Sequence, residues 1–544
     1  METATAARKE AKPSSRARNL IIFVGEGMDT TTVTAARILQ AQLAAGPASA
    51  QPVGESNLLP FELFPATALT KTYTVDLQTT ETAGAMSALM TGVKTNGASV
   101  SVDPSLKKGD CKVAAPPAPG AVGNPFGRLP TLLEQAKDAG LSAGLVTTGR
   151  VTQSAPAAAY AHASDRDWES DAFEPQAALA AGCVDIARQL AEFDHHGGLD
   201  LVFGGGRLKF LPVSAMDPFG GGAGERKDSR NLVEAWLVRH PDGLYLQTLK
   251  QFETTDWSRR RPVLGLFAPD RMAFSQDPVA LKQPGGEPSL TQMTRAAIMS
   301  LRSNKRGYVL VVDAAGIDAG HQAGNAFRAL TETIEFANAV RAARSLVNPG
   351  DTLIVVTATG GSTLTIGGYS QRGNGILNEA VGLGGQPEQD WRGLTYPTLI
   401  YANGPGAWTA SATQPWGPKH YPHRGFEVSR AETQGDAPEL AGAPVAAASA
   451  VLTELSEGPA ELNDSAPAST VDQLPLLSEI GPQDPRYLQP ASIPLPAQTH
   501  GGDDVPVYAR GPGAQWIHGV LEQNALYWIM RQAVPALAKT AKPQ

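Results

Sequence analysis

The chain has 544 residues, a mass of 56.9 kDa and a formal net charge of -8. Hydrophobic residues make up 42% of it and charged residues 18%, a balance typical of globular proteins and not of disordered or coiled-coil chains. The acidic charge argues against nucleic acid as an obligatory partner, because binding to a phosphate backbone needs clustered Lys and Arg. No apolar run approaches the roughly 20 residues that a membrane span needs, so we expect no transmembrane segment.

The first 18 residues are polar, basic and rich in Ala. They lack the apolar stretch of a secretory signal peptide, so we predict a polar N-terminal tail over residues 1–18 with no visible signal peptide. Two interpretations remain open at this point. Either the protein is cytoplasmic, or a leader has been removed from the chain.

Strands and helices alternate along most of the chain. Residues 19–25 form an apolar run that ends in Gly, which predicts a strand buried on both faces, and residues 30–45 predict a helix. The same pattern predicts a helix over 325–346 and further strands at 141–147, 199–203, 307–312 and 351–357. This alternation predicts an α/β fold, with a central, mostly parallel β-sheet sandwiched by helices.

Polar residues follow several of these strands directly. In open parallel sheets, sites form at the carboxyl ends of the strands. Glu26, Asp313 and the segments 147–150 and 357–359 stand at such ends. We therefore expect the functional site at this edge of the sheet.

The composition changes after residue 371. Residues 372–498 are rich in Ala, Pro, Gly and Ser, which predicts an irregular insertion with long loops. In this division residues 19–371 form the α/β core, and residues 499–544 return to the core and end in a helix. Length alone allows one large domain with insertions or two to four domains.

Several blocks of the chain share the order and residue pattern of a known enzyme family. They include NLIIFVGEGMD at 19–29, TYTVDLQTTETAGAMSALMTGVKTN at 72–96, VTTGRVTQSAP at 146–156, VLVVDAAGIDAGHQ at 309–322, VTATGGSTLTIGGYSQRGN at 356–374 and THGGDDVPVYARGP at 499–512. Together they resemble the alkaline phosphatase family, in particular the branch that includes the animal enzymes. The resemblance runs from about residue 19 to residue 530 and implies that family's fold, with residues 372–498 as a crown-like insertion.

The resemblance also implies a particular chemistry. Enzymes of this family hydrolyse phosphate monoesters with two zinc ions about 4 Å apart and a magnesium ion behind them. A serine hydroxyl attacks phosphorus, and an arginine binds two phosphate oxygens. The family further implies a homodimer, with assembly with a homologous or other protein subunit as the alternative.

The catalytic positions of the family fall on Thr82 and Arg166. Thr82 stands in place of the nucleophilic serine, with Glu81 in place of the neighbouring Asp. Threonine keeps a hydroxyl and can serve as a nucleophile. Arg166 is the family's arginine, so the resemblance implies a phosphate-ester ligand.

The positions around magnesium carry altered residues. Glu26 replaces an Asp that contacts zinc and magnesium, Asp313 replaces a Glu, Ala155 replaces a hydroxyl ligand, and Gln153 replaces a nearby His. Each carboxylate exchange moves the charge by one methylene, about 1.5 Å, whereas metal–ligand distances hold to within about 0.2 Å. We expect magnesium to be weakly bound or absent.

The two zinc positions are changed further. At the first, Asp318 and His500 are retained, and Gln322 stands where the family has a second His. At the second, Thr359 and Gly360 replace an Asp–His pair. Gln is a poor zinc ligand, and one ion loses both an anionic and an imidazole ligand. We therefore expect zinc to be weakly bound or absent.

His321 offers a replacement imidazole. It lies three residues after Asp318, and on one turn of a helix residues i and i+3 share a face. The alternative interpretation places His321 in a loop, away from any metal.

The two cysteines bear on the compartment. Cys111 and Cys183 allow one disulfide or two free thiols on count alone. The resemblance implies a bridge between them, because relatives of the animal branch form a disulfide at these positions. A disulfide implies an oxidising compartment, and family members are periplasmic or secreted.

Two functions are compatible with these residues. In the first, the chain is a pseudoenzyme: the alkaline phosphatase scaffold with a dismantled two-zinc centre, acting as a binding or structural subunit. In the second, it is a divergent metal-dependent phosphomonoesterase in which Thr82 attacks, Arg166 holds the phosphate and one metal binds at Asp318 and His500. Losing most of one ion's charge costs several kcal/mol, so such an enzyme would be slower by on the order of a thousandfold.

Overall fold

A ten-stranded sheet forms the centre of the protein in the computed structural model, which describes residues 16–46, 54–110, 127–277, 284–390, 393–407 and 485–538. The strand order is β13-β2-β12-β8-β1-β7-β3-β4-β6-β5. The strands are β1 (Asn19–Gly25), β2 (Ala66–Lys71), β3 (Ser142–Arg150), β4 (Leu201–Gly205), β5 (Leu244–Leu246), β6 (Val263–Leu266), β7 (Tyr308–Ala314), β8 (Thr352–Ala358), β12 (Val505–Arg510) and β13 (Gly519–Glu522). In this sheet β12 runs antiparallel to its neighbours β2 and β8, and the other pairs are parallel.

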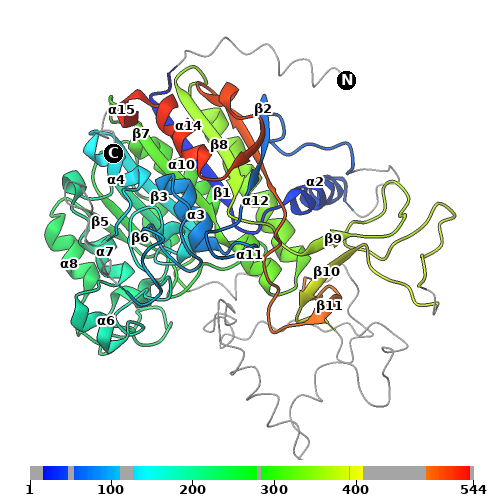
Figure 1. Cartoon of the computed structure of the whole chain (residues 1–544), viewed down its shortest axis with the longest axis horizontal. Coiled ribbons are helices and arrows are strands. Elements are labelled where there is room, and N and C mark those ends of the chain that lie inside the picture. Colours follow the sequence, from blue (N-terminus) through cyan, green and yellow to red (C-terminus); the bar gives the residue numbers. More distant parts are fainter. Residues whose placement is uncertain are drawn as a thin grey trace, which may run out of the picture.

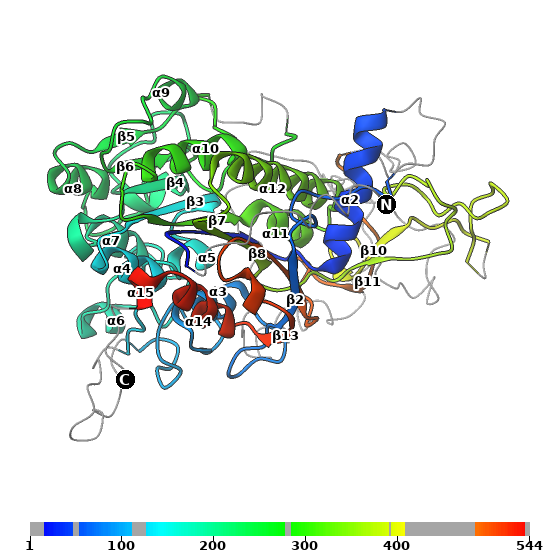
Figure 2. The same cartoon turned by 90° about the horizontal axis from the view of Figure 1, so that it is seen from above.

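Helices cover both faces of the sheet. They are α2 (Thr30–Ala45), α3 (Thr82–Thr91), α4 (Leu132–Asp138), α5 (Ser154–Ala157), α6 (Gln176–Ala181), α7 (Ile186–Ala191), α8 (Leu232–Arg239), α9 (Leu249–Glu253), α10 (Leu290–Leu301), α11 (Ala315–Gln322), α12 (Ala326–Leu346), α14 (Ala525–Ala533) and α15 (Pro535–Ala538). Figure 2 shows α10 and α12 on one side of the sheet and α3, α14 and α15 on the other. The predicted α/β fold, a mostly parallel sheet between helices, is confirmed.

Strand β1 shows why a continuous apolar run becomes a central strand. Successive side chains of a strand point to opposite faces. Leu20, Ile22 and Val24 therefore pack into one hydrophobic core, while Ile21 and Phe23 pack into the other. Both cores are covered by helices, so a strand at this position needs apolar residues on both faces.

The predicted elements agree closely with the observed ones. The strand at 19–25 and the helix at 30–45 have the observed bounds, and the helix predicted at 325–346 is α12. Helix α2 begins where the Asp29 carboxylate accepts a hydrogen bond from the backbone N–H of Thr32. The other predicted strands correspond to β3, β4, β7 and β8, within three residues at either end.

A small second sheet lies beside the core. It contains β9 (Leu364–Ile366), β10 (Leu399–Gly404) and β11 (Ala491–Pro494), in the order β11-β10-β9. Figure 1 shows this sheet and the long connection between β9 and β10 projecting from the body of the molecule. Strand β9 precedes residue 372, so the sheet takes strands from both sides of that predicted boundary. Residues 408–484 of the predicted insertion lie outside the described residues, and the division of the chain stays a prediction.

Of the two cysteines in the predicted disulfide, the described residues include only Cys183. Cys183 is disulfide-bonded. Cys111, its predicted partner, lies outside the described residues. Separately, none of the helices in the described part of the chain is long and apolar enough to cross a membrane.

Candidate active site

The carboxyl ends of β8, β1 and β7 bring the predicted site residues together. Gly25 of β1 is in register with Ala314 of β7 and Ala358 of β8. Glu26 and Thr359 follow directly after β1 and β8, and Asp313 is the second-to-last residue of β7. Residues far apart in sequence therefore meet at one edge of the sheet, as the strand ends predicted.

Glu26 and Asp313 form a buried carboxyl pair. Both side chains are fully buried, and Asp313 Oδ2 accepts a hydrogen bond of 2.6 Å from the Thr147 hydroxyl. Burial raises the pKa of Asp313 to about 7, against the opposing effects of hydrogen bonds from Thr147 and Glu26. The pair occupies the two positions at which the resemblance places carboxylate ligands.

Asp318, Gln322 and His500 form a second cluster, on α11 and the chain before β12. Asp318 Oδ2 accepts a hydrogen bond of 2.7 Å from Gln322 Nε2 and lies 3.2 Å from His500 Nε2. Burial raises the pKa of Asp318, but the charge and hydrogen bond of His500 outweigh this effect, so the pKa lies below its usual value. The other carboxylate oxygen, Oδ1, has no hydrogen-bond partner among the described residues.

Thr359 and Gly360 follow β8 at the predicted second zinc position. The Thr359 side chain is buried, and its hydroxyl has no hydrogen-bond partner in the described part of the chain. A Cβ atom at Gly360 would lie 2.8 Å from Cγ2 of Thr80. The Thr80 methyl group therefore occupies part of the space that a larger side chain at residue 360 would need.

Thr82 and Arg166 meet through Glu81 at the start of α3. The Glu81 carboxylate caps this helix by accepting hydrogen bonds from the backbone N–H groups of Ala83 and Gly84. The same carboxylate accepts a hydrogen bond of 2.9 Å from Arg166 Nη1. Thr82 is the first residue of the helix and its side chain is buried. The structure thus places both predicted catalytic residues around one helix N-terminus, where the Glu81 carboxylate is the anion that these donors bind.

Two further predicted positions lie on or beside the short helix α5. Ala155 is fully buried within it and offers no side-chain donor. Gln153 precedes the helix, and its Oε1 lies 2.7 Å from the position a Cβ would take at Gly149. The absence of a side chain at Gly149 therefore makes room for Gln153.

The expectation of a loop position for His321 is wrong. His321 lies in α11 and is fully buried. Its Nε2 is 3.1 Å from the Thr32 hydroxyl and its Nδ1 is 2.8 Å from the Tyr401 hydroxyl. Burial lowers the pKa of His321 to about 4, so the ring is neutral. Because both ring nitrogens have partners, this histidine does not offer a replacement imidazole in the observed arrangement.

The donor set does not fit a two-zinc centre. Among the described residues, no group of three or more His, Cys, Asp or Glu side chains is arranged so that it could hold a metal ion. Structural and catalytic zinc sites use at least three protein ligands of these types. The retained donors are instead bonded to one another, as Asp318 is to Gln322 and His500.

Two residues of the site escaped the sequence prediction. Thr80 fills space at Gly360, and its carbonyl oxygen lies 3.1 Å from His500 Nδ1. Gln523 Nε2 donates hydrogen bonds of 3.0 Å to the carbonyl oxygens of Ala358 and Thr359, which holds the end of β8. Gln523 is more than 160 residues away in sequence and carries no local signal. Thr147, in contrast, stood at a predicted strand end.

Comparisons with known proteins identify the family of the chain. The alkaline phosphatase family profile matches residues 17–536. The alkaline phosphatase of Gadus morhua is 34% identical over 525 residues, covering 95% of this chain and 92% of that protein. The tissue-nonspecific alkaline phosphatase of Homo sapiens is 33% identical over 524 residues, covering 95% of this chain and 83% of that protein.

Solved structures show the same fold. The alkaline phosphatase of Thermus thermophilus superimposes with a TM-score of 0.57 at 20% identity, covering 96% of this chain and 93% of that one. The enzyme from the Antarctic bacterium TAB5 gives a TM-score of 0.54 at 16% identity, covering 96% and 99%. The family match over nearly the whole chain, the identity to animal enzymes and this fold lead to one conclusion: the chain belongs to the alkaline phosphatase family.

Proposed function

We propose that this chain is a catalytically impaired member of its family, a pseudoenzyme that binds phosphate esters as a binding or structural subunit. The observation that carries the proposal is the end of β8. There a buried threonine hydroxyl and a glycine stand where the resemblance places an Asp–His pair, and the Thr80 methyl group lies 2.8 Å from the Cβ position of Gly360. An ion at this position would lack its anionic and its imidazole ligand.

The remaining candidate ligands support the same proposal. To bind zinc, Asp318 and His500 would have to give up their contact of 3.2 Å, and Gln322 its hydrogen bond to Asp318. At the magnesium position, the buried Ala155 offers no side-chain donor beside Glu26 and Asp313. These features support weak binding of zinc and magnesium, or none.

Thr82 and Arg166 support the ligand-binding part of the proposal. Phosphate binding requires cationic or N–H donors and not a metal ion as such. Arg166 is held beside the N-terminus of α3 by the Glu81 carboxylate, with which a phosphate group would compete for these donors. A phosphate monoester held there would keep its ester bond, because the charge that stabilises the leaving oxygen is missing.

The alternative function is a divergent phosphomonoesterase with Thr82 as the nucleophile. The proximity of Asp318 Oδ2 and His500 Nε2 favours it, because one ion could join this carboxylate and this imidazole. Such an enzyme would lack the second ion's stabilisation of charge, so its rate would be lower by on the order of a thousandfold.

Metal content and hydrolysis of p-nitrophenyl phosphate at alkaline pH distinguish the two functions. We expect purified protein to hold well below one zinc ion per chain, and Thr82→Ala to leave any trace of hydrolysis unchanged. Thr79→Ala is the matched control, because Thr79 is exposed and precedes the site by three residues. About one zinc ion per chain, together with a phosphorylated form that disappears in Thr82→Ala, would favour the alternative. Nearly two zinc ions per chain with the same Thr82-dependent phosphorylated form would overturn the proposal of a pseudoenzyme.

We also propose that the chain forms a homodimer in an oxidising compartment, periplasmic or secreted. The disulfide at Cys183 supports the compartment, and membership of the family supports the dimer. Light scattering should give twice the chain mass of 56.9 kDa, and thiol titration of the unfolded, unreduced protein should find no free thiol. A monomer contradicts the first part and two free thiols contradict the second.

A further inference from the structure

A row of cationic side chains lies along the amino edge of the central sheet, at the opposite ends of the strands from the candidate site. It comes from three segments that precede strands, namely residue 18 before β1, residues 259–261 before β6 and residues 302–306 before β7. These side chains are exposed, apart from the half-buried Arg261, and we call the row the basic edge: Arg18, Arg259, Arg260, Arg261, Arg302, Lys305 and Arg306. The row stands out on a chain whose net charge is -8.

The order of the strands makes these three segments neighbours. Strands β7, β3 and β4 lie between β1 and β6 in the sheet, and all five run parallel to one another. Their amino ends therefore meet at one edge. From β1 to β6 this edge spans four strand spacings, which is about 19 Å.

At one end of the row, Gly307 brings Arg18 and Arg306 together. A Cβ atom at Gly307 would collide with the Arg18 carbonyl oxygen, and its φ of +113° is one that glycine adopts readily. Burial raises the pKa of the Tyr308 hydroxyl, and the positive charges of Arg302 and Arg18 oppose this rise. Both guanidinium groups therefore lie near the same hydroxyl.

At the other end, a chain of polar contacts connects Arg260 to Arg306. Arg260 Nη2 lies 3.7 Å from Asp200 Oδ1, which also accepts a hydrogen bond of 3.2 Å from the Ser142 hydroxyl. Asn304 Nδ2 donates to that hydroxyl oxygen at 3.3 Å, and Asn304 Oδ1 accepts from the Arg306 N–H at 3.0 Å. The basic edge is therefore one continuous surface.

The acidic side chains of this edge do not neutralise it. Asp351 pairs with Arg18 at 2.6 Å, and Asp200 pairs with the buried Lys137 at 2.7 Å and with Arg260 at 3.7 Å. Among the described residues, no acidic side chain forms an ion pair with the remaining cations of the segment before β7, which are Arg302, Lys305 and Arg306. The edge thus keeps uncompensated positive charge and attracts anions.

The residue types of the basic edge favour oxyanion groups in a hydrated ligand. Six of its seven cations are arginines, whose planar guanidinium groups donate two parallel hydrogen bonds to a carboxylate, sulfate or phosphate. The exposed large apolar side chains in the described part of the chain all lie outside residues 16–18, 259–261 and 302–306. The edge therefore offers nothing to insert into a lipid bilayer.

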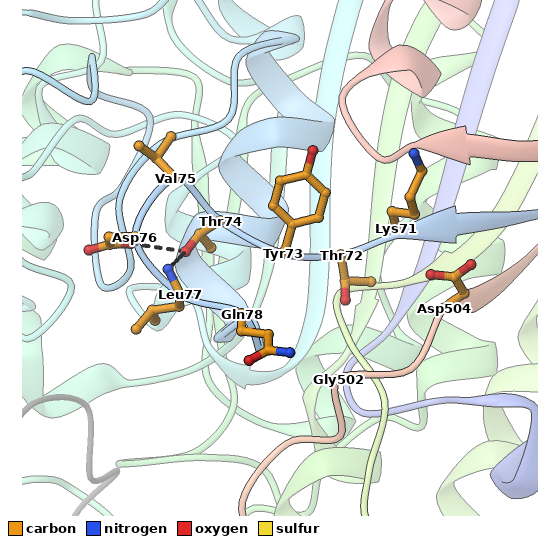
Figure 3. A pocket seen from close by; sticks show the side chains of 10 residues that line it. All are labelled: Lys71, Thr72, Tyr73, Thr74, Val75, Asp76, Leu77, Gln78, Gly502 and Asp504. Carbon is orange, nitrogen blue, oxygen red and sulfur yellow. Dashed lines mark hydrogen bonds between the residues drawn. The ribbon is translucent and has the colours of Figure 1, made fainter.

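Exposed aromatic rings are also found elsewhere. Tyr73, which is 45% exposed, lines a groove of about 500 Å³ beside the candidate site, at the other edge of the sheet (Figure 3). Proteins that bind single-stranded nucleic acid stack bases on such rings. A row of arginines without an aromatic surface fits a polymer that carries oxyanions but no bases.

We propose that the basic edge binds a linear acidic polysaccharide through its sulfate or carboxylate groups. Oxyanions repeated along one polymer can contact successive guanidinium groups of the row. The candidate site lies about one strand length away, roughly 20 Å, so a polysaccharide at the basic edge does not reach it. The inference therefore goes beyond the proposed function and does not depend on it.

Titration of fluorescein-labelled heparin, followed by fluorescence anisotropy, tests the basic edge. We expect the triple variant Arg302→Gln, Lys305→Gln, Arg306→Gln to bind heparin at least about tenfold more weakly than the native chain at about 50 mM NaCl. The slope of log affinity against log salt concentration should fall by about two to three, because three ionic contacts are lost. The triple variant Lys107→Gln, Lys227→Gln, Arg372→Gln is the matched control, since it removes the same charge from exposed residues outside the row.

A second variant guards against a folding defect in the first. Arg259→Gln with Arg260→Gln changes a separate segment of the row and should also weaken binding, while the urea midpoint of both variants stays that of the native chain. Native protein that does not bind heparin would overturn the inference, and so would equal weakening in the control variant. Tighter binding to a DNA duplex or to vesicles containing phosphatidylglycerol than to heparin would overturn the choice of partner. Loss of phosphate-ester binding alone would count against the proposed function and not against this inference.

Discussion

The triple variant Thr80→Ser, Thr359→Asp, Gly360→His is expected to bind zinc and to hydrolyse p-nitrophenyl phosphate about a thousandfold faster than the native chain. The two substitutions after β8 supply the anionic and imidazole ligands that the second zinc position lacks. Thr80→Ser is needed because Thr80 Cγ2 lies 2.8 Å from the Cβ position of Gly360. Serine keeps the hydroxyl that donates to the Glu81 carbonyl oxygen at 2.9 Å.

Two controls accompany this variant. Thr80→Ser alone should leave zinc content and hydrolysis unchanged, because it adds no ligand. The double variant that keeps Thr80 should bind zinc less tightly than the triple variant, since the new histidine meets the Thr80 methyl group. If the triple variant binds zinc but gains no activity, the end of β8 is not what limits hydrolysis, and the changes at Glu26, Thr82 or Gln322 must be responsible.

Arg226→Met is expected to lower the free energy of unfolding by about 3–5 kcal/mol. The Arg226 side chain is fully buried and forms two hydrogen bonds, of 2.8 and 3.0 Å, with the Asp185 carboxylate. It also contacts Asp228 Oδ2 at 2.6 Å. Methionine fills a similar volume but leaves buried carboxylates without their cation, so the loss comes from uncompensated charge. Urea denaturation measures this loss in the free energy of unfolding: the midpoint should fall, while the dependence of the free energy on urea concentration stays unchanged.

Arg230→Met is the matched control for this effect. Arg230 Nη2 forms an ion pair of 2.6 Å with Glu192, but the two side chains are 37% and 30% exposed. Solvent screens such a pair, so we expect a loss below about 1 kcal/mol. Adding Asp185→Asn to Arg226→Met should recover part of the stability, because it removes one of the stranded charges. Equal losses in the two single variants would contradict this account.

Much of the fold was predictable from local patterns. A central parallel strand must be apolar on both faces, so β1 and β8 stand out as uninterrupted apolar runs. Helix α2 begins at an aspartate that caps it. The short strands β2 and β13 were not predicted. They lie at one end of the sheet, and each has exposed positions. Neither strand therefore has the continuous apolar sequence that predicts a buried strand.

Part of the site was predictable as well, because residues at the carboxyl ends of parallel strands must meet. Glu26, Asp313 and Thr359 did so. The neighbours of these residues were not predictable, since contacts between distant segments leave no local pattern. His321 is the clearest case. Its spacing from Asp318 allowed a metal ligand, but Thr32 and Tyr401 hold its two nitrogens.

The sequence by itself determined the family, the central strands and the identity of the residues at the ends of those strands. These follow from residue types and from periodicities of a few residues, which are local properties. Only the tertiary structure decided that Thr80 occupies space beside Gly360, that Gln523 holds the end of β8, and that the segments 71–78 and 502–504 enclose a groove. Packing between segments hundreds of residues apart depends on the shape of the whole fold, and local patterns carry no record of it.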